Sequence, residues 1–134
     1  MAKKTKLLDT NILIRFLTQD DLEKSDLAEK IFRNAKQDEL EIPDFILTEV
    51  VWVLLSFYKL TKKQVLEKLE AICIFEKFKL NKRVLRKAID IYRENNFSFV
   101  DAYLCALSVT GKYANLYSFD ERIKKLYKQL SVTI

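Results

Sequence analysis

Histidine is absent from this 134-residue chain, and glycine and proline occur only once each. Without histidine the chain cannot form a Ser-His-Asp triad, a Cys-His dyad or a histidine-ligated zinc site. The single glycine, Gly111, cannot supply a phosphate-binding P-loop or a GxGxxG dinucleotide turn. The chemistry of this protein therefore depends on carboxylates, hydroxyls, amides, lysines or arginines.

Cysteines and long apolar runs are also scarce. The two cysteines, Cys73 and Cys105, lie far apart in apolar stretches, and we expect both to be buried and reduced. The basic N-terminus is followed by only two apolar residues before Asp9, so it does not read as a signal peptide. No run approaches the ~18 apolar residues of a membrane span. We expect a cytoplasmic protein that does not enter a membrane.

Charge is unevenly distributed along the chain. The whole chain carries 24 basic and 19 acidic side chains, a net charge of +5. Residues 1–67 hold 11 basic and 12 acidic side chains, whereas residues 68–134 hold 13 basic and 7 acidic ones. The densest basic stretch runs from Lys59 to Lys87. Such a positive field attracts polyanions, although a solvated lysine-rich face without a partner explains the same bias.

Apolar periodicity predicts short strands that alternate with helices. Alternation of this kind is typical of a parallel sheet covered on both faces by helices. We expect a single α/β domain over residues 1–134, with a central parallel sheet of about four to five short strands. The expected strands are 6–8, 40–43, 78–80, 115–117 and 131–134, and the expected helices are 12–17, 22–36, 44–58, 61–75, 82–94, 98–110 and 121–127.

Two aspartates follow predicted strands. Asp9 ends the first strand, and in open α/β sheets ligands bind at the carboxyl ends of the strands. Asp120 follows the fourth predicted strand and precedes a helix. Both positions equally suit an N-cap, in which the carboxylate accepts a backbone N–H of the following helix. The two interpretations remain open for each residue.

Glu49 and Asp101 fall within predicted helices among apolar neighbours. A carboxylate inside an apolar helix face costs several kcal/mol unless something compensates it. For Glu49 the alternatives are a helix edge that reaches solvent or a basic partner. For Asp101 the alternative is a capping box with Ser98. The neighbours three and four positions away are Phe45, Ile46, Trp52 and Val53 for Glu49, and Phe97, Ser98, Leu104 and Cys105 for Asp101.

Together the four acids indicate a cation site. Two carboxylates ~4 Å apart repel by about 4 kcal/mol at an effective dielectric near 20, so a cluster of four requires a cation among them or raised pKa values. Because no histidine is available, the ligands are oxygens, which favour Mg²⁺ or Mn²⁺. Such an ion suits phosphate substrates, since it orients and acidifies an attacking water.

Four segments around these acids resemble a known family. They are LDTNIL at residues 8–13, TEVVWVL at 48–54, FVDAYLCA at 99–106 and SFD at 118–120. In this order and at these separations they resemble the signature blocks of PIN-domain ribonucleases, and most of all those of VapC-like toxins of toxin–antitoxin pairs. The resemblance spans nearly the whole chain.

The resemblance implies a Rossmann-like sheet and Mg²⁺- or Mn²⁺-dependent endonucleolytic cleavage of RNA that leaves 5′-phosphate and 3′-hydroxyl ends. Asp9, Asp101 and Asp120 would hold the metal, and Glu49 would complete the cluster and help to position the attacking water. The supporting polar residues would be Asn11 and Ser118. The family also implies homodimers and an antitoxin whose tail blocks the active-site groove. The basic residues that we expect to contact RNA are Arg15, Lys79, Lys82, Arg83 and Arg86.

Competing interpretations remain. A haloacid-dehalogenase-like phosphatase needs a second acid where Asn11 stands. A response-regulator receiver needs a middle strand that ends in an aspartate, and neither the strand expected at 40–43 nor the one at 78–80 does so. A non-catalytic RNA- or protein-binding module on a nuclease-like scaffold would use the same acids as helix caps and ion pairs. Metal binding distinguishes this last interpretation from the nuclease.

Overall fold

The computed structural model of this protein describes residues 4–18, 22–111 and 113–132. The chain divides into two compact units, an N-terminal unit up to Leu80 and a C-terminal unit from Asn81. The N-terminal unit contains β1 (Lys6–Leu7), α1 (Thr10–Thr18), α2 (Leu22–Asn34), β2 (Leu40–Glu41), α3 (Asp44–Ser56), α4 (Lys62–Ile74) and β3 (Phe78–Lys79). The C-terminal unit contains α5 (Lys82–Glu94), α6 (Phe99–Thr110) and α7 (Glu121–Val132).

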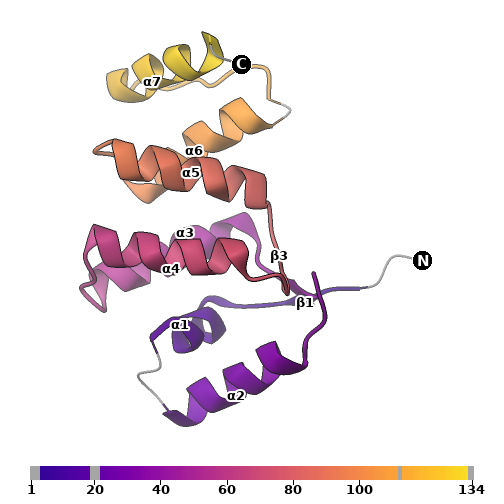
Figure 1. The fold of residues 1–134 in the computed structure, drawn as a ribbon. Coiled ribbons are helices and arrows are strands. Elements are labelled where there is room, and N and C mark those ends of the chain that lie inside the picture. The colour runs from indigo at the N-terminus through magenta and orange to yellow at the C-terminus, as the bar shows by residue number, and fades with distance from the viewer. Residues whose placement is uncertain (1–3, 19–21, 112, 133–134) are drawn as a thin grey trace. The chain divides into compact units, whose positions relative to one another are not determined.

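A short parallel sheet organises the N-terminal unit. The strand order is β1-β2-β3, and β2 pairs with both neighbours through Leu40, which lies opposite Lys6 on one side and Phe78 on the other. Helices α1 and α2 lie together on one side of the strands, and α3 and α4 lie on the other (Figure 1). Because all strands run in one direction, their carboxyl ends lie at the same edge, and Asp9 is located there after β1.

Aromatic side chains form much of the core of this unit. The rings of Phe16 and Phe32 lie 4.5 Å apart between centroids, those of Phe75 and Phe78 lie 4.6 Å apart, and Phe32 and Phe78 join the two pairs at 5.5 Å. Most of these contacts are edge-to-face, the arrangement that the ring quadrupole favours. The cluster therefore connects α1, α2 and the end of α4 to β3.

A capping box stabilises the start of α4. The Thr61 hydroxyl accepts the backbone N–H of Gln64 at 3.1 Å, and the Gln64 side chain accepts the backbone N–H of Thr61 at 2.9 Å. Such a reciprocal capping box satisfies two N–H groups that have no partner inside the helix. The helix expected at residues 61–75 is thus confirmed to within one residue at each end, since α4 spans Lys62–Ile74 with Thr61 as its N-cap.

The C-terminal unit is a group of three helices. Helix α5 packs along α6, and α6 contacts α7. The apolar face of α5 is buried, with Leu85, Ile89 and Tyr92 in the interior. Helix α6 contributes small buried residues, including Ala102 and Ala106, which allow the two helix backbones to approach closely.

The sheet is smaller than predicted. In the ranges that the structure describes it has three strands rather than four or five. The strand expected at residues 115–117 is irregular chain in which the Tyr117 side chain is exposed. The strand expected at 131–134 is also wrong in its first half, because residues 131 and 132 continue α7, while 133 and 134 lie outside the described residues.

The expectation for the cysteines is confirmed, since Cys73 and Cys105 are both buried and free. As to membranes, within the described part of the chain every helix falls short of the length and apolar character that a membrane span requires.

Candidate active site

Asp9 is the acidic residue at the carboxyl edge of the sheet. Its carboxylate Oδ1 accepts the backbone N–H of Ile12 at 3.0 Å, which makes Asp9 the N-cap of α1. The helix-cap interpretation is therefore confirmed for Asp9, while its role in binding a ligand after the strand remains a prediction. The carboxylate lies at the positive end of the α1 dipole, and the side chain is exposed to solvent.

Glu49 lies in the middle of α3 on an exposed face, so its predicted burial among apolar side chains is wrong. Its neighbours Phe45 and Trp52 are themselves 68% and 66% exposed. The helix is apolar almost all round, and only part of its surface faces the core, through residues such as Leu47 and Val50. Glu49 thus extends from an exposed apolar stripe and bears no burial cost.

Asp101 occupies the first turn of α6 and is half-buried. The Ser98 hydroxyl accepts the Asp101 backbone N–H at 3.1 Å, so the serine caps the helix, as the alternative interpretation of Asp101 expected. This contact uses the amide of Asp101 rather than its carboxylate. The carboxylate is therefore held near the positive end of the helix dipole by the position of its backbone.

Asp120 is the N-cap of α7 and is the most constrained of the four acids. Its Oδ1 accepts the backbone N–H of Arg122 at 2.8 Å, and its own backbone N–H is donated to the Ser118 hydroxyl at 3.0 Å. The Arg122 guanidinium forms an ion pair with the carboxylate, with Nη2 3.1 Å from Oδ2. These hydrogen bonds lower the pKa of Asp120, with the side-chain contact from Arg122 as the main cause.

Asp101 and Asp120, two of the four candidate acids, both act on one buried thiol. The pKa of Cys105 is raised to about 11, mainly by burial and in addition by the negative charges of Asp101 and Asp120. Arg122 likewise has a raised pKa because of Asp120 and, more weakly, Asp101. Asp101 and Asp120 therefore create one negative field, with Cys105 on its buried side and Arg122 at its surface.

In chemical type, the four acids match a hard divalent ion, because all of their donor atoms are carboxylate oxygens. The C-terminal unit already places one cation, the Arg122 guanidinium, on Asp120. Within neither unit do the described residues gather three or more acidic or cysteine side chains into a group that could hold a metal ion. The complete four-carboxylate cluster therefore remains a prediction.

Comparison with known proteins identifies the fold family. The sequence profile of the PIN domain matches residues 6–129, which include all four acids and extend over both units. The chain belongs to the PIN-domain family. It is also 33% identical over 127 residues to a VapC ribonuclease of Aquifex aeolicus (strain VF5), an alignment that covers 90% of this chain and 91% of that protein.

The basic residues expected to contact RNA occupy different settings in this PIN domain. Arg15 is half-buried, and its Nη1 donates to the Tyr58 hydroxyl at 3.5 Å. Lys79 lies 4.0 Å from Glu41, measured between Nζ and Oε1. On α5, Arg83 and Arg86 are exposed, while Lys82 is half-buried at the helix start.

Lys77, in the same basic stretch, has a structural role. Its ammonium donates to the backbone carbonyls of Phe32 and Arg33, both at 2.8 Å. These carbonyls belong to the last turn of α2, where C=O groups lack partners inside the helix and a cation is favourable. Lys77 thus caps α2, and its ammonium group is not part of the surface available to a polyanion.

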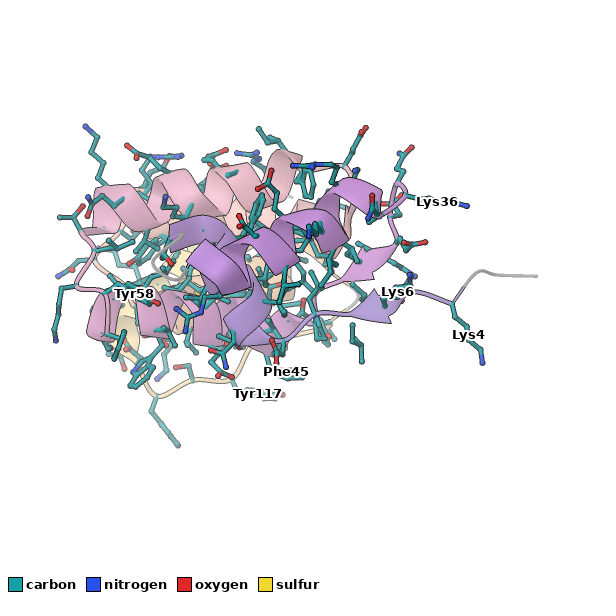
Figure 2. The ribbon with its side chains drawn as sticks, turned by 90° about the horizontal axis from the view of Figure 1, so that it is seen from below. Lys4, Lys6, Lys36, Phe45, Tyr58 and Tyr117 are labelled. Carbon is teal, nitrogen blue, oxygen red and sulfur yellow. The ribbon has the colours of Figure 1, made fainter. Side chains whose placement is uncertain are left out.

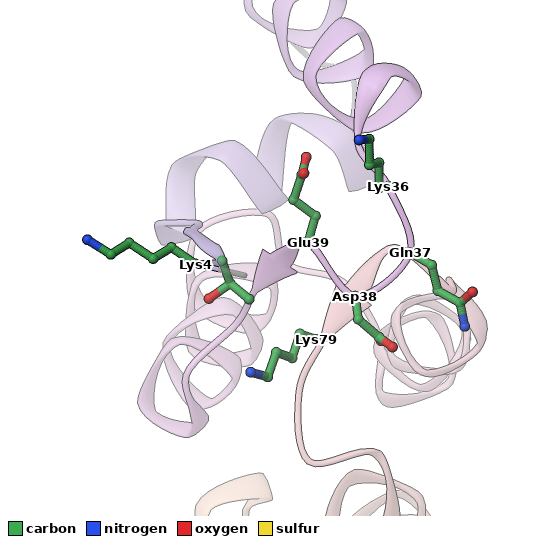
Figure 3. A pocket seen from close by; sticks show the side chains of 7 residues that line it. Lys4, Lys36, Gln37, Asp38, Glu39 and Lys79 are labelled. Carbon is green, nitrogen blue, oxygen red and sulfur yellow. The ribbon is translucent and has the colours of Figure 1, made fainter. Parts of the chain in front are cut away.

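A second basic feature of the PIN domain lies away from the carboxyl edge of the sheet. A cavity of about 490 Å³ opens at the amino ends of the strands, where Lys4, Lys36 and Lys79 are among its lining residues. Figure 2 shows Lys4, Lys6 and Lys36 at one end of the N-terminal unit and Tyr58 at the other. The ammonium groups of Lys4 and Lys79 extend to one side and that of Lys36 to another (Figure 3), so they do not converge on one ligand.

The sequence interpretation did not include Arg122. The sequence did contain a signal for its contact with Asp120, since an arginine two residues after an N-cap aspartate can reach back to that carboxylate. The other contacts of Arg122 could not be predicted from sequence spacing. Its Nη1 donates to the Asn96 carbonyl at 3.1 Å, and its guanidinium carbon lies 5.2 Å from the centre of the Phe97 ring.

Proposed function

We propose that this PIN domain is a metal-dependent endoribonuclease, the toxin of a type II toxin–antitoxin system, that hydrolyses RNA phosphodiester bonds. The main support is the family match over residues 6–129 combined with the retention of all four acids. The similarity to a VapC ribonuclease over most of both chains supports the choice of RNA as substrate.

The proposed site consists of Asp9, Glu49, Asp101 and Asp120, with Mg²⁺ or Mn²⁺ as the metal. When bound, such an ion acidifies a water and stabilises the charge that develops on the phosphorus. Three of these carboxylates are held at helix N-termini, beside the positive ends of the helix dipoles. Glu49 reaches solvent and would help to orient the attacking water.

Ser118 and Asn11 are the polar residues proposed to support the acids, and two arginines of α5 are proposed to bind RNA. The Ser118 hydroxyl accepts the Asp120 amide, so Ser118 shapes the turn that presents this carboxylate. Asn11 lies exposed in the first turn of α1, next to the turn that Asp9 caps. On the exposed surface of α5, Arg83 and Arg86 are suited to bind the RNA backbone, because they lie opposite the buried face of the helix.

Two protein partners belong to the proposal. An antitoxin would inhibit the enzyme by covering the exposed stripe of Phe45 and Trp52 on α3, which would also cover Glu49. A second copy of the chain would form a homodimer. Light scattering of the purified protein, alone and with the product of the neighbouring reading frame, measures both associations.

The alternative is a non-catalytic binding module, and one observation favours it. The Arg122 ion pair and the capping contact of Asp120 explain this residue without catalysis. Under this alternative a divalent metal does not change the melting temperature.

Cleavage of total RNA tests the proposal directly. Purified protein is incubated with RNA in the presence of Mg²⁺ or Mn²⁺, with and without EDTA, and the ends of the fragments are mapped. We expect cleavage that EDTA abolishes, with 5′-phosphate and 3′-hydroxyl ends. Equal cleavage in EDTA, or none in any condition, would contradict the proposal.

A further inference from the structure

The Arg122 side chain engages both carboxylate oxygens of Asp120. Nη2 donates to Oδ2 at 3.1 Å, and Nε donates to Oδ1 at 3.4 Å. The backbone N–H of Arg122 donates to Oδ1 at 2.8 Å. Paired N–H donors of this kind match the geometry of a carboxylate and hold it in one orientation. Asp120 is therefore neutralised by a residue of its own helix.

Two contacts hold Arg122 independently of Asp120. Nη1 donates to the Asn96 carbonyl at 3.1 Å, and the guanidinium carbon lies 5.2 Å from the centre of the Phe97 ring, within the range of a cation–π interaction. Asn96 and Phe97 precede α6, 26 and 25 positions before Arg122. If the contact with Asp120 is broken, these two contacts keep the cation beside the acid.

Arg122 lines a cavity in the same unit. The cavity has a volume of about 390 Å³, and its other lining residues include Phe97, Lys125 and Gln129. The side chain of Arg122 is 57% exposed and that of Asp120 is 33% exposed, so the pair lies at the surface rather than locked in the core. Water can therefore replace the contacts that the guanidinium gives up.

A cation already occupies this position. The Arg122 guanidinium lies 3.1 Å from the Asp120 carboxylate, measured from Nη2 to Oδ2. A divalent ion bound to Asp120 would need at least one of the oxygens that Arg122 now occupies. The guanidinium and the ion therefore compete for one ligand.

We propose that Arg122 is a built-in cation that neutralises Asp120 in the metal-free protein and must be displaced before a divalent ion binds this carboxylate. The inference rests on the proposed function, because it takes Asp120 as a metal ligand. Arg122 thus weakens the affinity for the metal and sets the concentration of metal at which the site fills. The displaced guanidinium stays near Phe97 and Asn96 as a positive charge beside the site.

The test is the dissociation constant for Mn²⁺ alone, measured by calorimetry or by the electron paramagnetic resonance signal of free Mn²⁺, without RNA. Loss of one exposed, charge-assisted contact corresponds to roughly a three- to tenfold change in affinity. We expect Arg122→Gln to bind Mn²⁺ more tightly by this factor. Arg122→Lys, which keeps the charge but loses the paired donors, should lie between Arg122→Gln and the wild type.

A matched control separates direct competition from a general loss of positive charge. Lys125→Gln removes one charge from the same helix and the same cavity, and we expect its effect on Mn²⁺ affinity to be clearly smaller than that of Arg122→Gln. An equal effect of the two substitutions would overturn the inference. Weaker Mn²⁺ binding in Arg122→Gln would also overturn it and would instead make Arg122 a residue that positions Asp120 for the metal.

Melting temperature provides a second readout that does not depend on activity. Arg122→Gln should lower the melting temperature in EDTA, where the ion pair is intact in the wild type, and the difference should shrink in saturating Mn²⁺. A difference that is the same in both conditions would contradict competition. If the wild type cleaves RNA and binds Mn²⁺ but Arg122→Gln changes neither measurement, only this inference fails. If no variant binds Mn²⁺, the proposed function fails with it.

Discussion

The two units of this PIN domain present their acids in different electrostatic states. In the N-terminal unit, Asp9 holds one backbone N–H through one oxygen, and Glu49 extends from an exposed face of α3. In the C-terminal unit, Asp120 is engaged through both oxygens by Arg122, and Asp101 contributes to the same field. Asp9 and Glu49 are thus open to a ligand, whereas the Asp120 carboxylate already binds a cation, the Arg122 guanidinium.

The difference shows that a helix cap and a metal ligand are compatible roles. An N-cap carboxylate uses one lone pair on one oxygen, so several acceptor sites remain for a metal. The paired N–H donors of a guanidinium occupy both oxygens, and its positive charge repels any second cation. Asp9 and Asp120 both cap helices, and only Asp120 is also bound in an ion pair.

The largest expected effect is the loss of catalysis on removal of an acid from either unit. Asp101→Asn should lower RNA cleavage by ~100-fold or more, the scale of a lost catalytic group, while circular dichroism and the melting temperature remain near those of the wild type. Asp9→Asn should cause a loss of similar size if both units serve one site. Asp90→Asn, a solvent-accessible aspartate paired with Arg93 on α5, is the control. Retained activity in Asp101→Asn, or loss in Asp90→Asn, would contradict the assignment.

Metal binding should depend on Asp9, the exposed acid of the N-terminal unit that caps α1. Mg²⁺ or Mn²⁺ at ten times its dissociation constant stabilises the folded state by about 1.4 kcal/mol, which raises the melting temperature by several degrees. Asp9→Asn should abolish this rise. Asp26→Asn, an exposed aspartate of α2, should retain it. A rise of equal size in Asp9→Asn would show that the metal does not bind to Asp9.

The raised pKa of Cys105, caused first by burial and then by the charges of Asp101 and Asp120, has a consequence for stability at high pH. Since the pKa of Cys105 is raised from 9.0 to about 11, the unfolded chain releases this proton at a lower pH than the folded protein. The contribution is fully present below pH 9 and is lost as pH rises toward 11.

Urea unfolding at pH 8 and pH 10 measures this loss. The wild type should lose on the order of 1 kcal/mol more of its unfolding free energy than Cys105→Ala over this interval. An identical pH dependence of the two proteins would indicate that the pKa of Cys105 is not raised in the folded protein.

The smallest expected effect is that of replacing the exposed Glu49 on the stability of the protein. Glu49→Gln should change the unfolding free energy of the metal-free protein by less than about 0.5 kcal/mol, because the side chain is solvated. Urea denaturation in EDTA measures this value, and Glu67→Gln on the exposed surface of α4 is the matched control. A destabilisation well above that of Glu67→Gln would point to a structural ion pair at Glu49.

Sequence reasoning was most accurate where the determining contact is local. The capping box at Thr61 and Gln64 and the serine cap at Ser98 join residues three positions apart, and the structure contains both. The bounds of α5 were also correct, because its apolar residues recur at helical spacing and its buried face follows from that period.

Reasoning from the sequence failed where distant segments decide the outcome. Glu49 was expected to be buried because its helical neighbours are apolar, but Phe45 and Trp52 are exposed. Apolar spacing alone does not say which side of an almost wholly apolar helix meets the core. The strand expected at residues 115–117 failed for a related reason, because a short apolar run becomes a strand only when a neighbouring strand pairs with it.

The chain by itself determined the order of most helices and strands, the acids at the helix starts and the family to which the protein belongs. These features depend on hydrogen bonds and periodicities that span a few residues. Tertiary structure alone decided that Lys77 caps α2 from more than 40 positions away and that Arg122 is held by Asn96 and Phe97 as well as by Asp120. Such contacts depend on which segments fold against one another, and no short spacing in the sequence encodes that choice.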